Sequence, residues 1–502
     1  MGGLSEKSSG AAWDHLRRPP VWLPPALLTL AVTVTGLGSA QLWRDELATW
    51  SAATRSPTDL ARLADTIDAA TGPYYLLMHV WTRIVGDSTV ALRVPAVLAM
   101  TVAAGLLAVL GARLVDRRTG LFAGLLFAVL PGTSRYGQEA RPYALATMLA
   151  VLATVLLVTA LRRPSWTRWA GYAVAVTALG LIHLIALTLL AAHALVVVLA
   201  WWRGPADAGV GTRDHTTVDR DRRVWRWVVA VVPVVLLAGP LLVKARTQQS
   251  RQLNWVGLAR LDDLTALPGG VAQSSVVGGL LLGVAALGAA RLGRRALLPV
   301  SAVLLPVLLL FAAGAVVPLW VPRYLVFVVP FACLLAGAAL ASVAAPAALV
   351  VVVLAGLLGL PDQAALRRTH EWPRNAPVDY AGAARVIGDG QRPGDAVVYS
   401  PRHSWLFLDL GIEYHSDDPP RDVLVTEDEA RRGDLWAAEC PQPAQCLAGT
   451  PRVWLVVTGR HTDPLAAVPG AKGDALRAQF TVTQVWPRPG LTVALLTGRS
   501  GS

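Results

Sequence analysis

Acidic side chains gather in one stretch, residues 43–90, directly after an apolar run. The run 24–42 has about the length needed to cross a bilayer, so Asp45 and Glu46 stand where a membrane helix meets water. A carboxylate in that position can stay ionised and still reach a lipid headgroup. Group transfer to a hydroxyl needs such a carboxylate to accept the hydroxyl proton. The pattern therefore predicts an active site in this stretch, with Asp45 as the general base.

Two neighbours of Asp45 are further candidates for catalysis. Glu46 is adjacent, and because adjacent side chains on a helix diverge, we expect only one of the two to reach a given substrate atom. Asp68 is a second candidate acid before the Gly72-Pro73 bend, and the alternative is that it caps this bend. For Asp45 the alternative is an acid placed to suit a helix dipole. Acids at a membrane edge are functional by default, which favours catalysis.

Cationic and aromatic side chains in exterior segments are candidates for holding an anionic substrate. Exterior basic residues oppose the usual excess of Lys and Arg on the cytoplasmic side, and a phosphate-bearing ligand gives a reason for them. The alternatives are headgroup contacts or ion pairs for the cations and belt positions for the tyrosines. The proposed substrate-binding residues are Arg44, Tyr74, Tyr75, Glu139, Arg141, Tyr143, Lys244, Arg246, Arg323 and Tyr324.

Several classes of enzyme lack support in the chain. No Gly-rich nucleotide loop follows a strand pattern, and there is no metal-spaced His/Cys cluster and no Gly-x-Ser-x-Gly elbow. A nucleotide-driven pump and a serine hydrolase are therefore not indicated. Activation would come from a lipid-linked substrate. No cofactor is indicated, and the sequence leaves open whether a divalent metal takes part.

Apolar helices must position these residues. Of the 502 residues 54% are hydrophobic, which is typical of a polytopic membrane protein. The net charge of +12 does not indicate nucleic acid, because the basic residues lie between apolar runs. The runs predict eleven spanning helices, near 24–42, 91–112, 120–134, 143–161, 169–184, 185–202, 226–243, 272–290, 296–317, 322–341 and 343–360.

The distribution of arginine predicts the topology. Four Arg-dense connections, within 113–118, 162–168, 203–226 and 291–295, fit the cytoplasmic side together with the N-terminus. To place all four connections and the N-terminus on the cytoplasmic side, the chain must cross the membrane eleven times, which puts the C-terminus outside. The short aromatic segment 74–86 then reads as an interfacial helix rather than a span. The first run is too long for a cleaved signal and is expected to be retained.

After Pro361 the composition becomes that of a small α/β domain. Cys440 and Cys446 flank a short loop there, and either a disulfide or two free thiols fits. Cys333 reads as a small core residue. The expected elements are helices at 379–387 and 471–479, strands at 395–399 and 452–458, and a hairpin over 481–497.

The order of several motifs resembles the lipid-dependent GT-C glycosyltransferases, in particular bacterial family 39-like members of the protein mannosyltransferase and aminoarabinose transferase group. The motifs are Trp43-Arg44-Asp45-Glu46, Asp68 to Leu77, Ala91-Leu92-Arg93-Val94-Pro95, Gln138 to Tyr143 and Pro322-Arg323-Tyr324. The resemblance implies a polyprenyl-phosphate sugar donor, Asp45 as catalytic base, and inversion at the anomeric carbon. The family often has Pro-Pro where this chain has Gly72-Pro73, and His in place of Thr71, which leaves the role of Asp68 open.

We therefore expect a GT-C-like membrane domain over residues 1–360, with 43–90 as its first exterior loop, and an extracytoplasmic α/β domain over 361–502. The expected function is transfer of mannose from a polyprenyl phosphate to a glycan, lipid or protein acceptor at the plasma membrane, with membrane lipids as surroundings. One alternative is a flippase for a lipid-linked glycan, although no paired halves are present. Another is a non-catalytic envelope-assembly protein, against which the acids at 45 and 46 argue.

Overall fold

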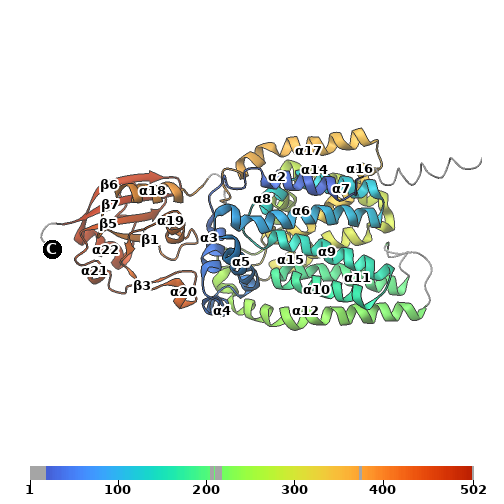
Figure 1. Ribbon diagram of the computed structural model, residues 1–502, viewed down its shortest axis with the longest axis horizontal. Coiled ribbons are helices and arrows are strands. Elements are labelled where there is room, and N and C mark those ends of the chain that lie inside the picture. The colour runs from blue at the N-terminus through green and yellow to red at the C-terminus, as the bar shows by residue number, and fades with distance from the viewer. Residues whose placement is uncertain (1–18, 204–208, 210–216, 372–375, 500–502) are drawn as a thin grey trace, which may run out of the picture.

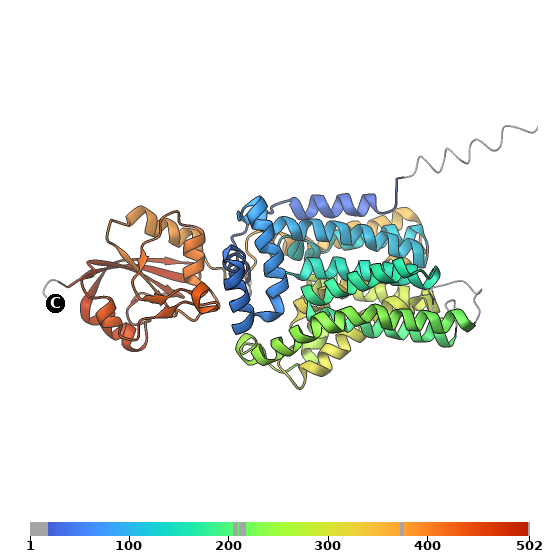
Figure 2. The same cartoon turned by 60° about the horizontal axis from the view of Figure 1, so that its bottom comes forward.

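Figure 1 shows a computed structural model of the chain, which describes residues 19–203, 209, 217–371 and 376–499. A bundle of long helices occupies one end of the molecule and a sheet domain the other (Figures 1 and 2). Three short helices lie between them: α3 (Arg44–Thr54), α4 (Pro57–Thr66) and α5 (Gly72–Val85). Within the predicted Arg-dense connection 203–226, residues 204–208 and 210–216 lie outside the described residues.

The bundle is built from apolar helices joined by short connections. Several begin at polar caps that precede the apolar run: Ser88 accepts from the N–H of Ala91, and Asp116 from that of Thr119. The helices are α2 (Leu23–Val34), α6 (Thr89–Leu114), α7 (Arg117–Val129), α8 (Pro131–Gly137), α9 (Tyr143–Arg162), α10 (Trp166–Ile182), α11 (Leu189–Trp202), α12 (Thr217–Gln252), α13 (Leu261–Ala272), α14 (Ser275–Leu292), α15 (Leu297–Gly314), α16 (Val329–Ala341) and α17 (Ala345–Leu366). Short 3₁₀ turns join bundle helices at η2 (Leu184–Thr188), η3 (Gly293–Ala296) and η4 (Pro322–Val328), and η1 (Ala69–Thr71) joins α4 to α5.

The apolar helices are those of a multi-pass membrane protein. Within the described residues, seven helical segments are long and apolar enough to cross a membrane. Three other predicted spans correspond to shorter helices, α2 with 12 residues, α7 with 13 and α10 with 17. The predicted spans 272–290 and 296–317 both overlap one of the seven segments, Ser275–Gly314. The number eleven therefore stays a prediction.

The first helix ends well before the predicted residue 42. Gly36 has a φ of 74°, a left-handed conformation that stops the helix after Val34. Backbone carbonyls released by this stop need hydrogen-bond partners. The amide of Gln138 donates to two of them, and the guanidinium of Arg93 donates to three more. The accepting carbonyls are those of Thr33 and Thr35 for Gln138, and of Leu37, Ala40 and Gln41 for Arg93.

Helix α12 is longer at both ends than the predicted span 226–243. Its last turns are polar and reach the exterior loop, where the Gln248 side chain accepts from the N–H of Ala69 at 2.9 Å. Arg251, near its end, pairs with Asp434 of the sheet domain at 2.6 Å. The end of α12 therefore connects the first exterior loop to the sheet domain.

The C-terminal part is a mixed five-stranded sheet in the order β2-β1-β5-β7-β6, in which β1 pairs in parallel with β2 and β5. The hairpin of β6 and β7 turns at Gly490, whose φ is 72°. Cys440 and Cys446 form a disulfide, so of the two possibilities left by the sequence the structure has the disulfide and not two free thiols. The elements are α18 (Tyr380–Gly390), β1 (Ala396–Ser400), α19 (Leu408–Tyr414), β2 (Arg421–Asp422), β3 (Val425–Glu427), α20 (Glu429–Arg432), β4 (Ala438–Glu439), α21 (Pro443–Cys446), β5 (Arg452–Thr458), α22 (Gly470–Gln479), β6 (Phe480–Arg488) and β7 (Leu491–Gly498).

The sheet domain packs on the first exterior loop. Helix α19 contacts α3, and α20 contacts α4. The guanidinium of Arg55 donates to the carbonyl of Asp434 at 2.8 Å, and Arg44 pairs with Glu371 at 3.2 Å. The loop that carries Asp45 is therefore held from both sides, by the bundle and by the sheet domain.

Candidate active site

A cavity of about 650 Å³ lies where the bundle, the first exterior loop and the sheet domain meet. The bundle contributes an apolar sector, helix α3 and the segments between the helices contribute most of the charged groups, and the sheet domain contributes aromatic and aliphatic side chains. The apolar sector includes Ile182, Leu184, Ile185, Leu242, Val317 and Leu319. The polar groups include Arg44, Asp45, Asp68, Tyr75, Arg141, Tyr143, His183, Arg246, Gln249, Gln252, Arg323 and Tyr324.

Asp45 lies on the first turn of α3 and lines the cavity. Its carboxylate is 3.4 Å from the guanidinium of Arg323, and about a fifth of its side chain is exposed. The same guanidinium donates through Nε to the hydroxyl of Tyr143 at 3.1 Å. Asp45 is thus an accessible carboxylate beside a cation that a short helix and a tyrosine hold in place.

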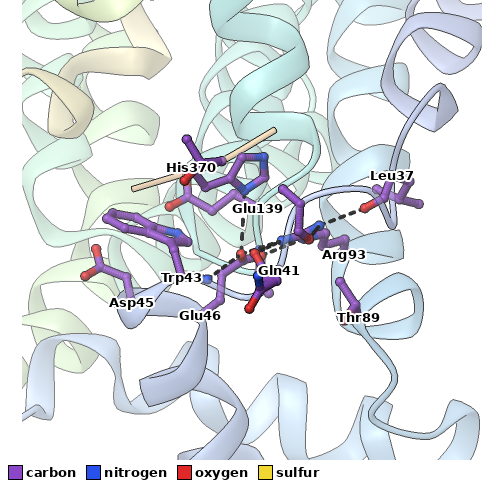
Figure 3. A network of polar contacts seen from close by, with 12 residues as sticks. Leu37, Gln41, Trp43, Asp45, Glu46, Thr89, Arg93, Glu139 and His370 are labelled. Atoms are coloured by element: carbon purple, nitrogen blue, oxygen red, sulfur yellow. Dashed lines mark hydrogen bonds and ion pairs between the residues drawn. The ribbon is translucent and has the colours of Figure 1, made fainter. Parts of the chain in front are cut away.

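Glu46 has the opposite environment, although it is the next residue. It is fully buried and forms a two-pronged ion pair with Arg93, with Nε to Oε1 at 2.8 Å and Nη2 to Oε2 at 2.7 Å. It also accepts from the N–H groups of Ala140 and Trp43. Figure 3 shows Glu46 pointing into this network and Asp45 pointing away from it.

The prediction of Glu46 as a catalytic acid is therefore corrected. Its side chain does not line the cavity, and both oxygens already accept hydrogen bonds. Burial raises the pKa of Glu46, but the attraction and hydrogen bonds of Arg93 outweigh it and hold the pKa below its usual value. Glu46 joins α3, α6 and the segment before α9.

Asp68 lines the cavity and is nearly buried. It accepts from the hydroxyl of Tyr75 at 2.7 Å and from the amide of Gln252. Tyr75 in turn accepts from Arg141 at 3.3 Å. Because no backbone N–H of the following turn bonds to the Asp68 side chain, the alternative of a cap on the bend is wrong. Asp68 instead anchors a chain of polar groups that ends at Arg141.

Arg141 connects these polar groups to helix α3. Its Nη1 lies 3.4 Å from the carbonyl of Asp45 and 3.4 Å from the hydroxyl of Thr49. The alternatives of an ion pair with Glu139 or with a first-loop carboxylate are therefore not what the structure contains. Arg246, further along the cavity wall, is exposed and has no ion-pair partner among the residues the structure describes. Both guanidinium groups face the cavity.

Three other proposed binding residues do not line the cavity. Tyr74 is buried in α5 behind Tyr75. Lys244 points to the surface, where it pairs with Asp65 at 3.1 Å. Glu139 is fully buried and lies 2.9 Å from Arg135. These side chains miss the cavity because of the way in which each helix or turn is rotated relative to it. Local sequence does not reveal that rotation.

Glu139 belongs to the buried network of Glu46 rather than to the cavity. Burial, together with the neighbouring carboxylates of Glu46 and Asp45, raises the pKa of Glu139 to about 7 against the opposing effect of Arg135. His370, on the segment after α17, lies 3.6 Å from Glu46 (Figure 3). Burial, together with the charges of Arg135 and Arg93, lowers the pKa of His370 to about 3, so this imidazole is neutral. The segment that follows α17 thus completes the network.

The structure adds cavity residues that the sequence did not indicate. His183 lines the cavity, and its Nδ1 has no hydrogen-bond partner among the described residues. Trp255 and Trp405 come from the α12–α13 connection and the sheet domain. In the sequence, the one hint of these two residues is that each tryptophan lies outside a predicted span or strand. That hint is too weak to predict a site. Among the described residues no three His, Cys, Asp or Glu side chains are grouped to hold a metal ion.

The comparisons with known proteins agree with this fold. Residues 72–206 match the family described as dolichyl-phosphate-mannose-protein mannosyltransferase. The apo crystal structure of ArnT from Cupriavidus metallidurans has a TM-score of 0.60 and 13% identity, and the match covers 97% of this chain and 98% of that one. The structure of ArnT from Cupriavidus metallidurans bound to undecaprenyl phosphate has a TM-score of 0.60 and 15% identity, with the same coverage of both chains. The apo structure of an oligosaccharyltransferase from Archaeoglobus fulgidus has a TM-score of 0.49 and 11% identity, and the match covers 95% of this chain and 74% of that one.

No curated protein matches the chain. At these identities the two ArnT structures indicate the fold alone, and the family match covers the segment that begins at α5 and includes α6 to α11. Together they confirm the resemblance drawn from the sequence motifs: the chain is a multi-pass membrane protein of the GT-C glycosyltransferase fold, similar to glycosyltransferase family 39.

Proposed function

We propose that the chain transfers a sugar from a polyprenyl-phosphate donor to a hydroxyl acceptor on the extracytoplasmic side, with inversion at the anomeric carbon. The observation that carries the proposal is Asp45, an accessible carboxylate in a cavity that combines guanidinium groups with an apolar wall. A donor of this class has the complementary parts, a phosphate and an isoprenoid chain. The fold supports the same class.

The isoprenoid chain would lie along the apolar sector. Leu242 belongs to this sector and is 57% exposed, and it is followed by Val243, which is 68% exposed on the outer surface of α12. In a membrane these surfaces face lipid, so a lipid substrate can enter sideways from the bilayer. That ArnT is described bound to undecaprenyl phosphate supports a polyprenyl phosphate here.

The phosphate would lie among Arg141, Arg246 and Arg323. Guanidinium groups donate paired hydrogen bonds to phosphate oxygens, and they stabilise the charge that grows on the leaving phosphate. The acceptor oxygen attacks the anomeric carbon while the bond from that carbon to the phosphate oxygen breaks. The phosphate leaves with the electron pair of this bond. Asp45 takes the hydroxyl proton and later releases it to water.

Mannose is the sugar we expect, supported by the description of the family that matches residues 72–206. We further propose that the sheet domain is extracytoplasmic at the plasma membrane. Its support is the position of three Arg-dense connections, within 113–118, 162–168 and 291–295, at the opposite end of the bundle (Figures 1 and 2). The acceptor is a molecule that meets the cavity on that side.

The test is release of polyprenyl phosphate by the purified chain from a panel of radiolabelled polyprenyl-phosphate sugars. Turnover of one donor fixes the reaction class and the sugar together, and mannose is the expected one. No release from any donor, with the protein folded and a membrane extract supplied as acceptor source, would overturn the proposal.

Substitution of Arg246 by alanine is expected to weaken undecaprenyl phosphate binding about ten- to a hundredfold, since one charge-assisted hydrogen bond contributes roughly 1.5–3 kcal/mol. Arg246 is exposed, so its loss leaves the fold intact. Lys244→Ala is the matched control, because this cation lies two residues earlier on the same helix and points out of the cavity. It should bind within about threefold of wild type. Equal losses in both variants would show a general surface charge effect rather than a phosphate site.

A further inference from the structure

The sheet domain sends one loop to the cavity. The loop leaves β1 at its carboxyl end, a position at which α/β sheets commonly bind ligands, and leads into α19. It brings Trp405 and Phe407 to the cavity wall, and Leu435 lies beside them. We propose that this roof (Trp405, Phe407 and Leu435) is the acceptor subsite, and that the acceptor presents a saccharide ring which packs on the indole of Trp405. The inference rests on the proposed function.

The loop is held in one conformation by side chains from elsewhere in the domain. The hydroxyl of Tyr380 donates to the carbonyl of Leu406 at 2.5 Å, and the indole N–H of Trp436 donates to the carbonyl of Ser404 at 3.0 Å. Trp436 also contacts Trp405 edge to face, with ring centroids 4.8 Å apart. Trp405 is therefore fixed before any ligand arrives, which lowers the entropy cost of binding.

Phe407 carries an unusual backbone conformation. Its φ of 50° lies in the left-handed region, which a bulky side chain adopts at an energetic cost. Among the described residues only Gln273 is another non-glycine residue with positive φ. Such conformations persist where the surroundings enforce them and concentrate at ligand sites. Here the strained residue lines the cavity, stacked on Trp436 at 5.7 Å.

The tryptophans of the cavity differ in what covers their rings. Trp43 has the guanidinium groups of Arg44, Arg135 and Arg323 within 5.8 Å of its ring centroid, and Trp255 has that of Arg323 at 5.2 Å. Among the described residues no cation lies over Trp405, which is only half-buried. The first two rings therefore belong to the cationic side of the cavity, while Trp405 offers an uncharged aromatic surface.

The chemistry of this surface favours a saccharide over a peptide. The apolar face of a pyranose ring carries polarised C–H groups that pack on the electron-rich face of an indole. A peptide in an extended conformation needs free backbone partners. At this loop two of the carbonyls, those of Ser404 and Leu406, are already used by Trp436 and Tyr380. A hydroxyl of the bound sugar would then be the group whose proton Asp45 accepts.

The test measures binding of soluble saccharides to the purified full chain by ligand-observed NMR. The probes are methyl glycosides of di- and trisaccharides of mannose, glucose and galactose, and a Ser/Thr-containing peptide is included as the competing class. Wild type should bind at least one saccharide. Trp405→Ala should lower that affinity about tenfold or more, and Trp405→Phe, which keeps an aromatic face, should stay within about threefold.

Trp486→Ala is the matched control, because this tryptophan of the same domain stacks on Trp454 and does not line the cavity. It should bind saccharide as wild type does, and undecaprenyl phosphate binding should be unchanged in all variants. The inference is overturned if no saccharide binds wild type, if Trp405→Ala has no effect, if only the peptide binds through Trp405, or if undecaprenyl phosphate binding falls in parallel. Because none of these readouts needs donor cleavage, their failure is distinct from failure of the proposed function.

Discussion

Replacing Asp45 by asparagine is expected to lower turnover about 10²–10⁴-fold, the usual contribution of a general base. Asparagine keeps the size and shape of the side chain but cannot accept the hydroxyl proton. Asp45 is partly exposed, and the one ion pair it forms with another described residue, Arg323, is long at 3.4 Å, so the substitution leaves no buried charge unpaired. Binding of undecaprenyl phosphate should therefore remain within about threefold of wild type.

The measurement is single-turnover release of polyprenyl phosphate at saturating donor, with binding measured separately. Asp65→Asn serves as the control, because it removes a carboxylate from the same exterior loop at a position that is 80% exposed and faces away from the cavity. Its turnover should be close to that of wild type. Near-normal turnover of Asp45→Asn would remove the base from the mechanism and leave Asp45 as a partner of Arg323 alone.

The second large effect concerns Glu46 and Arg93. Removing one partner of this fully buried pair leaves the other charge buried without compensation, which typically costs about 3–5 kcal/mol of stability. We expect Glu46→Gln and Arg93→Leu to melt several degrees lower than wild type. Arg93→Leu should be the more damaging, because it also withdraws the donors from three backbone carbonyls between α2 and α3.

Thermal unfolding in detergent measures this, with Asp59→Asn as the control. Asp59 pairs with Arg62 at 3.2 Å on the surface, where an ion pair contributes about 0–1 kcal/mol. The double variant of Glu46 and Arg93 should be no less stable than Arg93→Leu alone, since the pair is lost only once. A Glu46→Gln protein as stable as wild type but with turnover as low as that of Asp45→Asn would move the catalytic base by one residue.

The fold class and the position of Asp45 could be predicted from the sequence because their signals are local. A long apolar run is visible in consecutive residues, and so is the acid that follows it. Two helices and four strands of the C-terminal part could likewise be predicted from alternation and turn residues, and the structure has β5 at the predicted residues, Arg452–Thr458. The short elements between β1 and β5 were not predicted. The order of short motifs pointed to the GT-C fold, which the comparisons confirm.

Tertiary structure alone decided which of these residues share a cavity. Asp45 and Glu46 are adjacent acids in the sequence, and only the tertiary structure turns Glu46 toward Arg93 of α6, 47 residues away, and leaves Asp45 facing the cavity. The rotation of α12 likewise turns Arg246 toward the cavity and Lys244 toward Asp65 at the surface. Trp405 reaches the site from a different domain. Such contacts join residues far apart in the chain, and local periodicity carries no information about the direction in which a helix or loop is turned by its distant neighbours.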